Sequence, residues 1–479
     1  MKTQLLPIRQ LDKRVSLGAC IALLAAAVTP HVSLAATFDV NLQSAHFTLY
    51  TDPYNGNEVK VGGFSGLFPV PGKPDSFYVP TDRGPAPDFV DAEGKPFKTF
   101  IAPGFGPHIL TVRLMRNGTA KIDDVKPLKR PGGGHISGLP TSKPATDVPY
   151  DLNLDLLPFD EDSLDVEGIT IDPWGNFWVC DEYKPSVAMV AHNGKVQLRL
   201  VPAGTLTGLE QVPTYDVLPG VLAKRRNNRG LEGIAAAADG ILYAIMQRPL
   251  SNPNRAAGDA NGNARLVAIN LNTLLNGSPE PLVRQYLYRI PTIPNNVTLS
   301  DLFSTGPGRL LVPERGTDKL FEIDVTGATD LTPLENASTG KLISDPTKTL
   351  EQLNTDGLAA LGVVPVSKTV VIDSLTAIDP LLEKVEGVCV VGNSIVLTYD
   401  NDFNIADVAS IPASPNPNGP FVQVELLGGN FPKIFVVPLP FEIGGSPRHE
   451  RGGSHGSHGA TTGKEPQWPH SFRDGRHPE

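Results

Sequence analysis

The chain has 479 residues, with 41 lysines and arginines against 51 aspartates and glutamates, a formal net charge of −10 at pH 7. This balance argues against nucleic acid as a partner, because binding a polyanion needs a positive surface. With 47 glycines and 46 prolines between short apolar runs, the composition favours a large all-β domain of many short strands.

The first 35 residues are typical of a cleaved signal peptide. An apolar run from Val15 to Val28 follows a basic start, and small residues at 33–36 offer a cleavage site. The run is shorter than the ~20 residues that span a bilayer, and no later run approaches that length. We therefore expect no membrane span, a secreted or periplasmic location and a mature chain from about Ala36. Loss of four basic residues and one acidic residue leaves 37 against 50, a net charge of −13.

Five segments repeat one pattern: a polar residue before a small one, a short apolar run, a turn, a second apolar run and then a polar residue. They lie at 62–84, 164–187, 228–249, 299–316 and 384–403. Each length fits two strands of about five residues joined by a tight turn. Because an antiparallel hairpin places its first residue beside its last, we expect Glu167 beside Asp181 and Glu182. The same argument places Glu386 near Asp400 and Asp402, and Ser65 near Asp82.

Five hairpins with polar groups at one end predict a β-propeller, in which equivalent strand ends gather at one mouth of a channel. Their starts lie about 65 to 100 residues apart, more than a plain blade of ~40–50 residues needs, so we expect six or seven blades with long inter-blade loops. Residues 38–50 would close the ring by sharing a blade with 421–427 and 433–439. A sandwich or barrel could use the same strands but would not explain the repeated polar corners. The domain should cover 36–443, before a disordered Gly/Ser/His-rich tail at 444–479.

The hairpins also carry a family resemblance. The blocks VEGITIDPWGNFWVCDEYKPSV, NRGLEGIAAAADGILYAIMQRPL, PERG, VEGVCVVGNSIVLTYDNDF and FYVPTDRGP resemble those of the phytase-like domain family, also described as esterase-like activity of phytase. They occur in the expected order over roughly residues 60–440. The resemblance implies a secreted or periplasmic propeller with phytase activity or another ester-cleaving activity.

Carboxylates that converge on one mouth repel one another unless they are protonated or neutralised by a cation. Ca²⁺ takes six to eight oxygen ligands in flexible geometry, whereas Mg²⁺ prefers a stricter octahedron. The expected metal ligands are Asp82, Asp181, Glu182, Glu314, Asp400 and Asp402, and the expected catalytic groups are Glu167, Glu232 and Glu386. The alternative is a set of solvated or internally hydrogen-bonded corners, in which any cation has only a structural role.

Three arginines precede glycine within or beside the repeats: Arg83, Arg229 and Arg315. An arginine fork binds phosphate oxygens in pairs, so these residues are candidates for binding the substrate anion. Alternatively, they pair with neighbouring acids and hold the blades together. The basic run KRRNNR at 224–229 fits either an exposed loop or a rim that attracts phosphate.

These features favour a cation-dependent, monomeric hydrolase acting on a small-molecule phosphate or carboxyl ester. The rival hypothesis is a non-catalytic, calcium-stabilised module that binds a ligand or the cell envelope. A G-x-S-x-G match at 452–456 lies in the tail and is rejected as a nucleophile elbow. Cys180 and Cys389 are compatible with a disulfide or with two buried thiols, and Trp174 and Trp178 are expected to pack in the core or between blades.

Overall fold

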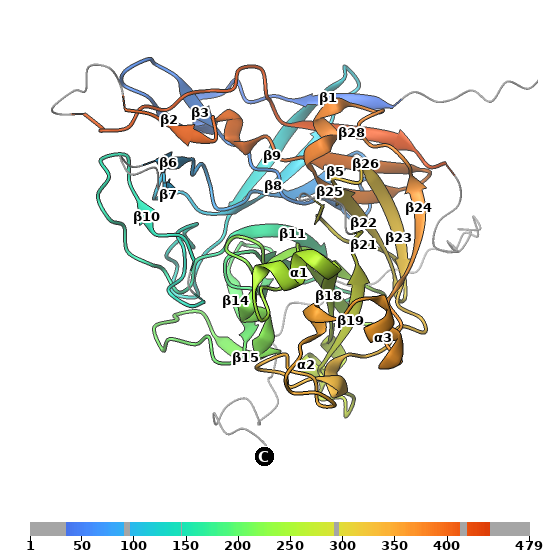
Figure 1. Ribbon diagram of the computed structural model, residues 1–479. Helices are drawn as coiled ribbons and strands as arrows, with labels where there is room; N and C mark the ends of the chain where they lie inside the picture. The colour runs from blue at the N-terminus through green and yellow to red at the C-terminus, as the bar shows by residue number, and fades with distance from the viewer. Residues whose placement is uncertain (1–34, 91–95, 145, 292–296, 412–418, 441–479) are drawn as a thin grey trace, which may run out of the picture. The chain divides into compact units, whose positions relative to one another are not determined.

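The computed structural model describes residues 35–90, 96–144, 146–291, 297–411 and 419–440 (Figure 1). The expected signal peptide, the Gly/Ser/His-rich tail and the G-x-S-x-G match lie outside these residues. Within the described ranges, no helix combines the length and the apolar character that crossing a membrane requires.

Five groups of strands follow one another along the chain as the blades of a β-propeller, and we number these blades 1 to 5; blades 1 and 5 belong to one eight-stranded sheet. Blade 1 comprises β4 (Phe68–Pro69), β5 (Ser76–Pro80), β8 (His108–Leu114) and β9 (Thr119–Pro127). Blade 2 comprises β11 (Val166–Ile171), β12 (Phe177–Asp181), β13 (Ser186–Val190), β14 (Val196–Pro202) and β15 (Thr214–Leu218). Blade 3 comprises β16 (Leu231–Ala236), β17 (Ile241–Met246), β18 (Asn263–Asn270) and β19 (Val283–Arg289).

Blades 4 and 5 complete the series. Blade 4 comprises β20 (Thr298–Leu299), β21 (Phe303–Gly306), β22 (Arg309–Arg315), β23 (Lys319–Asp324) and β24 (Ser367–Ile372). Blade 5 comprises β25 (Val385–Val391), β26 (Ser394–Tyr399), β28 (Lys433–Pro438) and β1 (Ala36–Val40). A separate small sheet contains β6 (Asp88–Val90), β7 (Pro96–Thr99), β10 (Pro149–Tyr150) and β27 (Val408–Ala409), and β2 (Thr48–Thr51) pairs with β3 (Glu58–Lys60).

The blades form a closed ring. The inner strands contact one another in the order β4, β11, β16, β21, β25 and back to β4. The N-terminal strand β1 pairs with the C-terminal strand β28, which confirms the expected closure, although residues 48–51 and 421–427 lie outside blade 5. Because the described residues form five blades, the expected count of six or seven is not confirmed.

Helices are short and lie outside the blades. They are α1 (Arg255–Asn261), α2 (Leu271–Asn276) and α3 (Thr355–Ala360). A short 3₁₀ helix, Pro380–Lys384, directly precedes β25, which begins at Val385.

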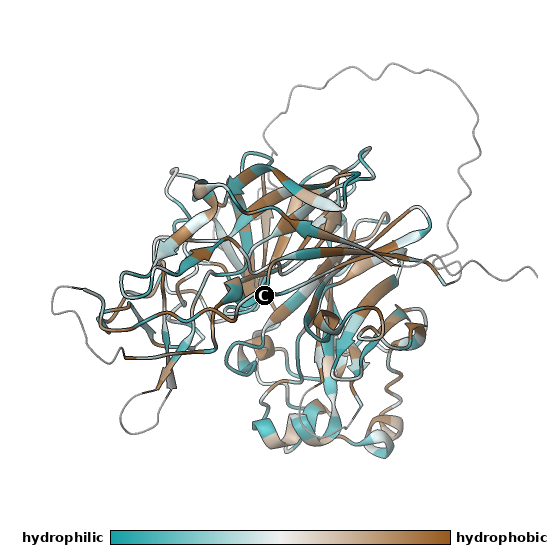
Figure 2. Cartoon of the chain, turned by 90° about the horizontal axis from the view of Figure 1, so that it is seen from above, coloured by the Kyte–Doolittle hydropathy of each residue, from teal (hydrophilic) through white to brown (hydrophobic). Residues whose placement is uncertain are grey.

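The hydrophobic cores lie between neighbouring blades, and Figure 2 shows hydrophobic stretches along many of the strands. Trp178 belongs to the core between blades 2 and 3, and its indole N–H donates to Asp172 Oδ2 at 2.9 Å. The expected packing is therefore confirmed for Trp178. It is wrong for Trp174, which lies in a turn and is 47% exposed. Cys180 and Cys389 are both buried and free, so they form no disulfide.

A β-bulge opens the inner strand of three blades. In blade 2, Val166 pairs with Asp181 and Gly168 with Cys180, so Glu167 is an extra residue in the ladder. Glu232 and Glu386 are skipped in the same way in blades 3 and 5. The glycine after each glutamate lies against a neighbouring inner strand: a Cβ on Gly233 would stand 2.5 Å from the carbonyl carbon of Asp301.

Blade 4 departs from this pattern, with Ser300-Asp301 where blades 2, 3 and 5 have Glu-Gly and blade 1 has Ser65-Gly66. The buried Asp301 carboxylate accepts backbone N–H bonds from Leu67 at 3.3 Å, Val388 at 3.1 Å and Leu302 at 2.8 Å. Leu67 precedes β4 and Val388 lies in β25, so one side chain ties blade 4 to blades 5 and 1. Burial raises the pKa of Asp301 well above its usual value.

Replacement of Gly233 by alanine should destabilise the fold by about 3 kcal/mol, because a new Cβ in a tightly packed site must displace backbone. The contacts it would meet, at 2.5–2.6 Å, are all backbone atoms of 300–302. Gly104→Ala is the matched control, since its Cβ would meet nothing within 4 Å. Urea unfolding measures both variants. Equal stability of Gly233→Ala and wild type would show that the inner strands are not in close contact.

Candidate functional site

Each blade offers two equivalent positions at the open end of its inner hairpin. The strand pairs Phe64–Thr81, Val166–Asp181, Leu231–Met246, Leu299–Glu314 and Val385–Tyr399 define the same level in all five blades. The residue after each first partner is the start position, occupied by Ser65, Glu167, Glu232, Ser300 and Glu386. The residue after each second partner is the end position, occupied by Asp82, Glu182, Gln247, Arg315 and Asp400.

Blade 2 brings three carboxylates together. Oxygen atoms of Asp165, Glu167 and Glu182 all lie within 4.8 Å of one another, and Asp165 and Glu182 are buried. Asp165 was not among the candidates from the sequence. The sequence could have indicated Asp165 only through its position two residues before Glu167. Nothing in the local pattern showed that the Asp165 side chain would face the other two carboxylates.

Burial and mutual repulsion favour the neutral forms of these acids. Burial first, then Asp165, Glu232 and Glu182, raises the pKa of Glu167 well above its usual value. Burial likewise raises the pKa of Glu182 to about 8, and Asp165 adds to the effect. The pKa of Glu232 is raised well above its usual value by burial and by Glu182 and Glu386. A buried hard cation would relieve the repulsion among these oxygens.

The acids of blades 1 and 5 continue the cluster. Burial and Asp400 raise the pKa of Asp82 well above its usual value. Asp400 also raises the pKa of Glu386, after burial. Although burial acts in the opposite direction, Lys384 at 3.4 Å lowers the pKa of Asp400 to about 2. Burial and Asp400 raise the pKa of Asp402, which also pairs with Lys384, to about 7.

Two expected metal ligands are engaged elsewhere. Asp181 accepts from Arg199 and, at 2.9 Å, from Ser186 Oγ. Glu314 accepts from Tyr288 Oη at 3.1 Å, Lys368 Nζ at 2.6 Å and Thr317 Oγ1 at 2.7 Å. Because successive residues of a strand face opposite sides, the side chain before each end position turns away from it. We therefore leave Asp181 and Glu314 out of the proposed site.

Each of the three Arg-Gly arginines makes an ion pair. Arg83 contacts Asp165 at 2.6 Å, Arg229 contacts Glu182 at 3.3 Å, and Arg315 pairs with Glu386. These contacts agree with the structural interpretation of the arginines. Arg229 and Arg315 additionally line a cavity, so they lie between the carboxylates and an open space.

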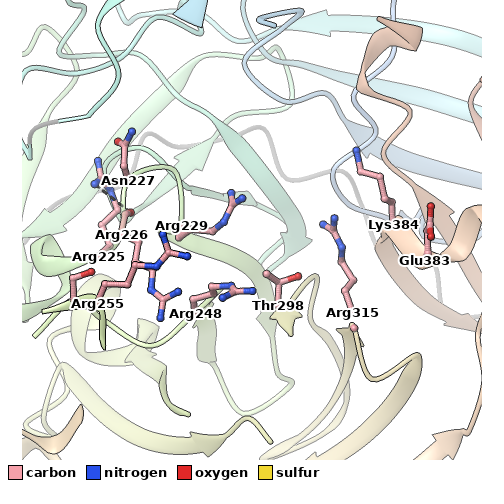
Figure 3. A pocket seen from close by; sticks show the side chains of 12 residues that line it. Arg225, Arg226, Asn227, Arg229, Arg248, Arg255, Thr298, Arg315, Glu383 and Lys384 are labelled. Carbon is pink, nitrogen blue, oxygen red and sulfur yellow. Dashed lines mark hydrogen bonds between the residues drawn. The ribbon is translucent and has the colours of Figure 1, made fainter. Parts of the chain in front are cut away.

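That cavity has a volume of about 730 Å³ and is strongly basic (Figure 3). Of the described residues, six arginines, one lysine and a single acid, Glu383, line it; the basic ones are Arg225, Arg226, Arg229, Arg248, Arg255, Arg315 and Lys384. The basic run at 224–229 therefore lies at the rim, as one of its two interpretations expected. Arg248 and Arg255 were missed, because they are isolated in sequence. Asp259 holds Arg226, Arg248 and Arg255 together through one carboxylate.

Without a cation, the protein should lose stability as the pH rises from about 5 to about 8. The pKa of Glu182 is about 8 in the fold against 4.5 for an ordinary glutamate. A raised pKa contributes stability that is complete below the unfolded value and is lost as the pH rises through the folded one. We expect the Tm of chelated protein to fall over this range, and to fall less in Glu182→Gln. Identical pH profiles for the two proteins would contradict this account.

Comparisons with known proteins identify the family of this chain but not its activity. Virginiamycin B lyase from Staphylococcus aureus is 10% identical, with 85% of this chain and 99% of that chain covered and a TM-score of 0.30. A periplasmic gluconolactonase from Pseudomonas aeruginosa is 12% identical, with 85% and 100% covered and a TM-score of 0.30. Aldose sugar dehydrogenase from Streptomyces coelicolor is 10% identical, with 84% and 98% covered and a TM-score of 0.32. These likenesses are too distant to bear on the chemistry.

No curated protein matches the chain. The model of the phytase-like family, described as esterase-like activity of phytase, matches residues 59–403. This match includes the five inner hairpins and all ten start and end positions. The chain therefore belongs to the phytase-like family.

Proposed function

We propose that the chain is a cation-dependent hydrolase that cleaves phosphate or related esters of small molecules outside the cytoplasm. One observation carries most of this proposal: the basic cavity and the buried carboxylates meet through shared side chains. Arg229 and Arg315 line the cavity while pairing with Glu182 and Glu386. An anion bound to these arginines would therefore rest against the carboxylate cluster.

The cavity suits an anionic group on the substrate. Guanidinium groups present forked N–H donors that match phosphate oxygens, and their charge persists at any ordinary pH. In Figure 3, Arg226, Arg248 and Arg255 gather on one side of the cavity, with Arg315 and Lys384 on the other. Because Glu383 is the only acid among the described residues of the lining, positive charge predominates where the substrate would enter.

The carboxylate cluster suits a hard cation. Asp165, Glu167 and Glu182 offer only oxygen donors, within 4.8 Å of one another, as Ca²⁺ binding requires. These three residues would hold the ion, while Arg83 and Arg229 would orient Asp165 and Glu182 through their ion pairs. A bound cation would polarise the ester and make water easier to deprotonate.

Glu386 is the proposed proton acceptor. Arg315 orients its carboxylate from the cavity side, and burial raises its pKa above the ordinary glutamate value. A carboxylate with a raised pKa accepts a proton more readily near neutral pH. Glu386 would take the proton from the attacking water while Arg315 stabilises the developing charge on the substrate.

The test follows phosphate release from phytate and 4-nitrophenyl phosphate, and 4-nitrophenol release from 4-nitrophenyl acetate, with Ca²⁺ and with chelator. We expect turnover that chelation abolishes and Ca²⁺ restores. Glu386→Gln should lower kcat by about 100-fold or more, the usual contribution of a general base. The exposed Glu58→Gln should retain full activity.

If no ester is cleaved but Ca²⁺ raises the melting temperature, the hydrolase proposal is refuted. The calcium-stabilised binding module would then account for the same cluster. Cleavage of 4-nitrophenyl acetate alone would retain ester hydrolysis and exclude phosphate esters as the substrate class.

Arg248 tests the basic cavity separately from the cation. Arg248 pairs with Asp259 at 3.8 Å, and Asp259 is not one of the three clustered carboxylates, Asp165, Glu167 and Glu182. Arg248→Met should raise KM for phosphate esters by about tenfold with little change in kcat, as loss of a charged hydrogen bond predicts. Initial-rate kinetics measure both constants, with the exposed Arg116→Met as the control. An unchanged KM would mean that the substrate anion binds elsewhere.

A further inference from the structure

Blade 3 contains two buried oxygen atoms that accept no hydrogen bond from any described residue: Glu232 Oε2 and Gln247 Oε1. The two residues are only 2% and 4% exposed. The two groups are in contact, because Gln247 Nε2 donates to the other carboxylate oxygen, Glu232 Oε1. With Glu232 ionised, that bond sets the orientation of the amide, since the flipped amide would place two oxygens against each other. Two neighbouring acceptors are therefore left without a donor.

The backbone holds this pair in place. Gln247 N donates to Gly230 O at 2.8 Å, and Leu299 N of blade 4 donates to Gln247 O at 3.0 Å. Glu232 is the extra residue of the β16 bulge. Both side chains therefore project from ordered positions that are shared between two blades, and rotation of the backbone cannot easily bring a donor to them.

The surroundings of the pair are negatively charged. Besides burial, the carboxylates of Glu182 and Glu386 disfavour a charge on Glu232, and Arg229 only partly offsets them. A neutral water could satisfy the two acceptors but would leave this repulsion in place. A cation would satisfy both acceptors and the surrounding charge together.

The repeat supports the same occupant. Glu232 and Gln247 hold in blade 3 the start and end positions that Glu167 and Glu182 hold in blade 2. Two residues before the start position, blade 2 has Asp165 and blade 3 has Gly230. The open end of the inner hairpin therefore carries oxygen ligands in both blades: three carboxylates in blade 2, and one carboxylate and one amide oxygen in blade 3.

We propose that Glu232 Oε2 and Gln247 Oε1 ligate a second hard divalent cation, one blade away from the ion proposed at Asp165, Glu167 and Glu182. This inference rests on the proposed function for the first ion, and it makes the site binuclear. Glu182, which interacts electrostatically with both Glu167 and Glu232, lies at the junction of the two corners. Water would complete the coordination, and with a single protein charge the second ion should be bound more weakly than the first.

Calorimetric titration of the chelated full-length protein with Ca²⁺ tests the proposal. Wild type should bind two ions. Gln247→Leu, which removes the amide oxygen at similar volume, should bind one, and Glu167→Gln should lose the tighter ion. Gln247→Glu adds a charge at the second corner, so the weaker ion should bind at least about tenfold more tightly. Gln43→Leu, at an exposed glutamine, should still bind two.

The rival occupant of the pair is a proton on Glu232. In that case wild type and Gln247→Leu would bind one ion alike, and Gln247→Glu would not tighten binding, which overturns the proposal. If that single ion is lost in Glu167→Gln, the first ion and the proposed function survive. If wild type binds no ion, both the first and the second cation are refuted. Should Gln247→Leu fail to fold, the Gln247→Glu titration decides the question.

Discussion

Backbone contact between neighbouring inner strands is the constraint on which the rest of this propeller depends. A Cβ on Gly233 would meet backbone of 300–302, and one on Gly387 would lie 2.9 Å from the carbonyl carbon of Gly66. Strands packed this closely leave no space for side chains between them. The residue before each such glycine leaves the ladder as a bulge, and in three blades it is a glutamate. The geometry that closes the ring therefore also gathers the carboxylates.

The arginines reconcile this concentration of charge with folding. Arg83 joins blade 1 to Asp165 before blade 2, Arg229 joins the start of blade 3 to Glu182 of blade 2, and Arg315 joins blade 4 to Glu386 of blade 5. Each pair thus bridges two blades. A guanidinium has five N–H donors, and one carboxylate engages only some of them. Holding blades together and binding a substrate anion are therefore compatible roles for Arg229 and Arg315.

The sequence was sufficient to predict the hairpins, their polar ends and the pairing of the terminal strands, because a regular spacing carries that information. The blade number was not predictable, since long insertions such as 325–366 lie within one blade and mimic additional ones. The assignments of Asp181 and Glu314 depended on which of two adjacent side chains faces the mouth. A single bulge residue decides that choice, and a bulge has no clear signature in a lone sequence.

Asp165, Asp301 and Arg248 were beyond prediction for a different reason: their surroundings come from distant parts of the chain. Asp165 meets Arg83 of the preceding blade, and Asp301 meets Leu67 and Val388. Arg248 joins Arg226 and Arg255 through Asp259 of α1. Local pattern identifies residues of the right chemistry, whereas the blade-to-blade contacts decide which of them share a site.

The closure of blade 5 has a consequence for how the molecule is made. Ala36 lies opposite Val436, and Asp39 opposite Lys433. The first strand to be synthesised therefore cannot pair with β28 until the last strand has been made. Blades 2, 3 and 4 can each form from continuous chain, but the ring stays open until nearly the whole polypeptide is available. Until then β1 has only β9 beside it and lacks β28, and the inner edge of β4 lacks β25; unpaired edges of this kind are where β proteins associate wrongly. The mouth of the channel is therefore completed late in folding, and only then do the charged groups of all five blades come together.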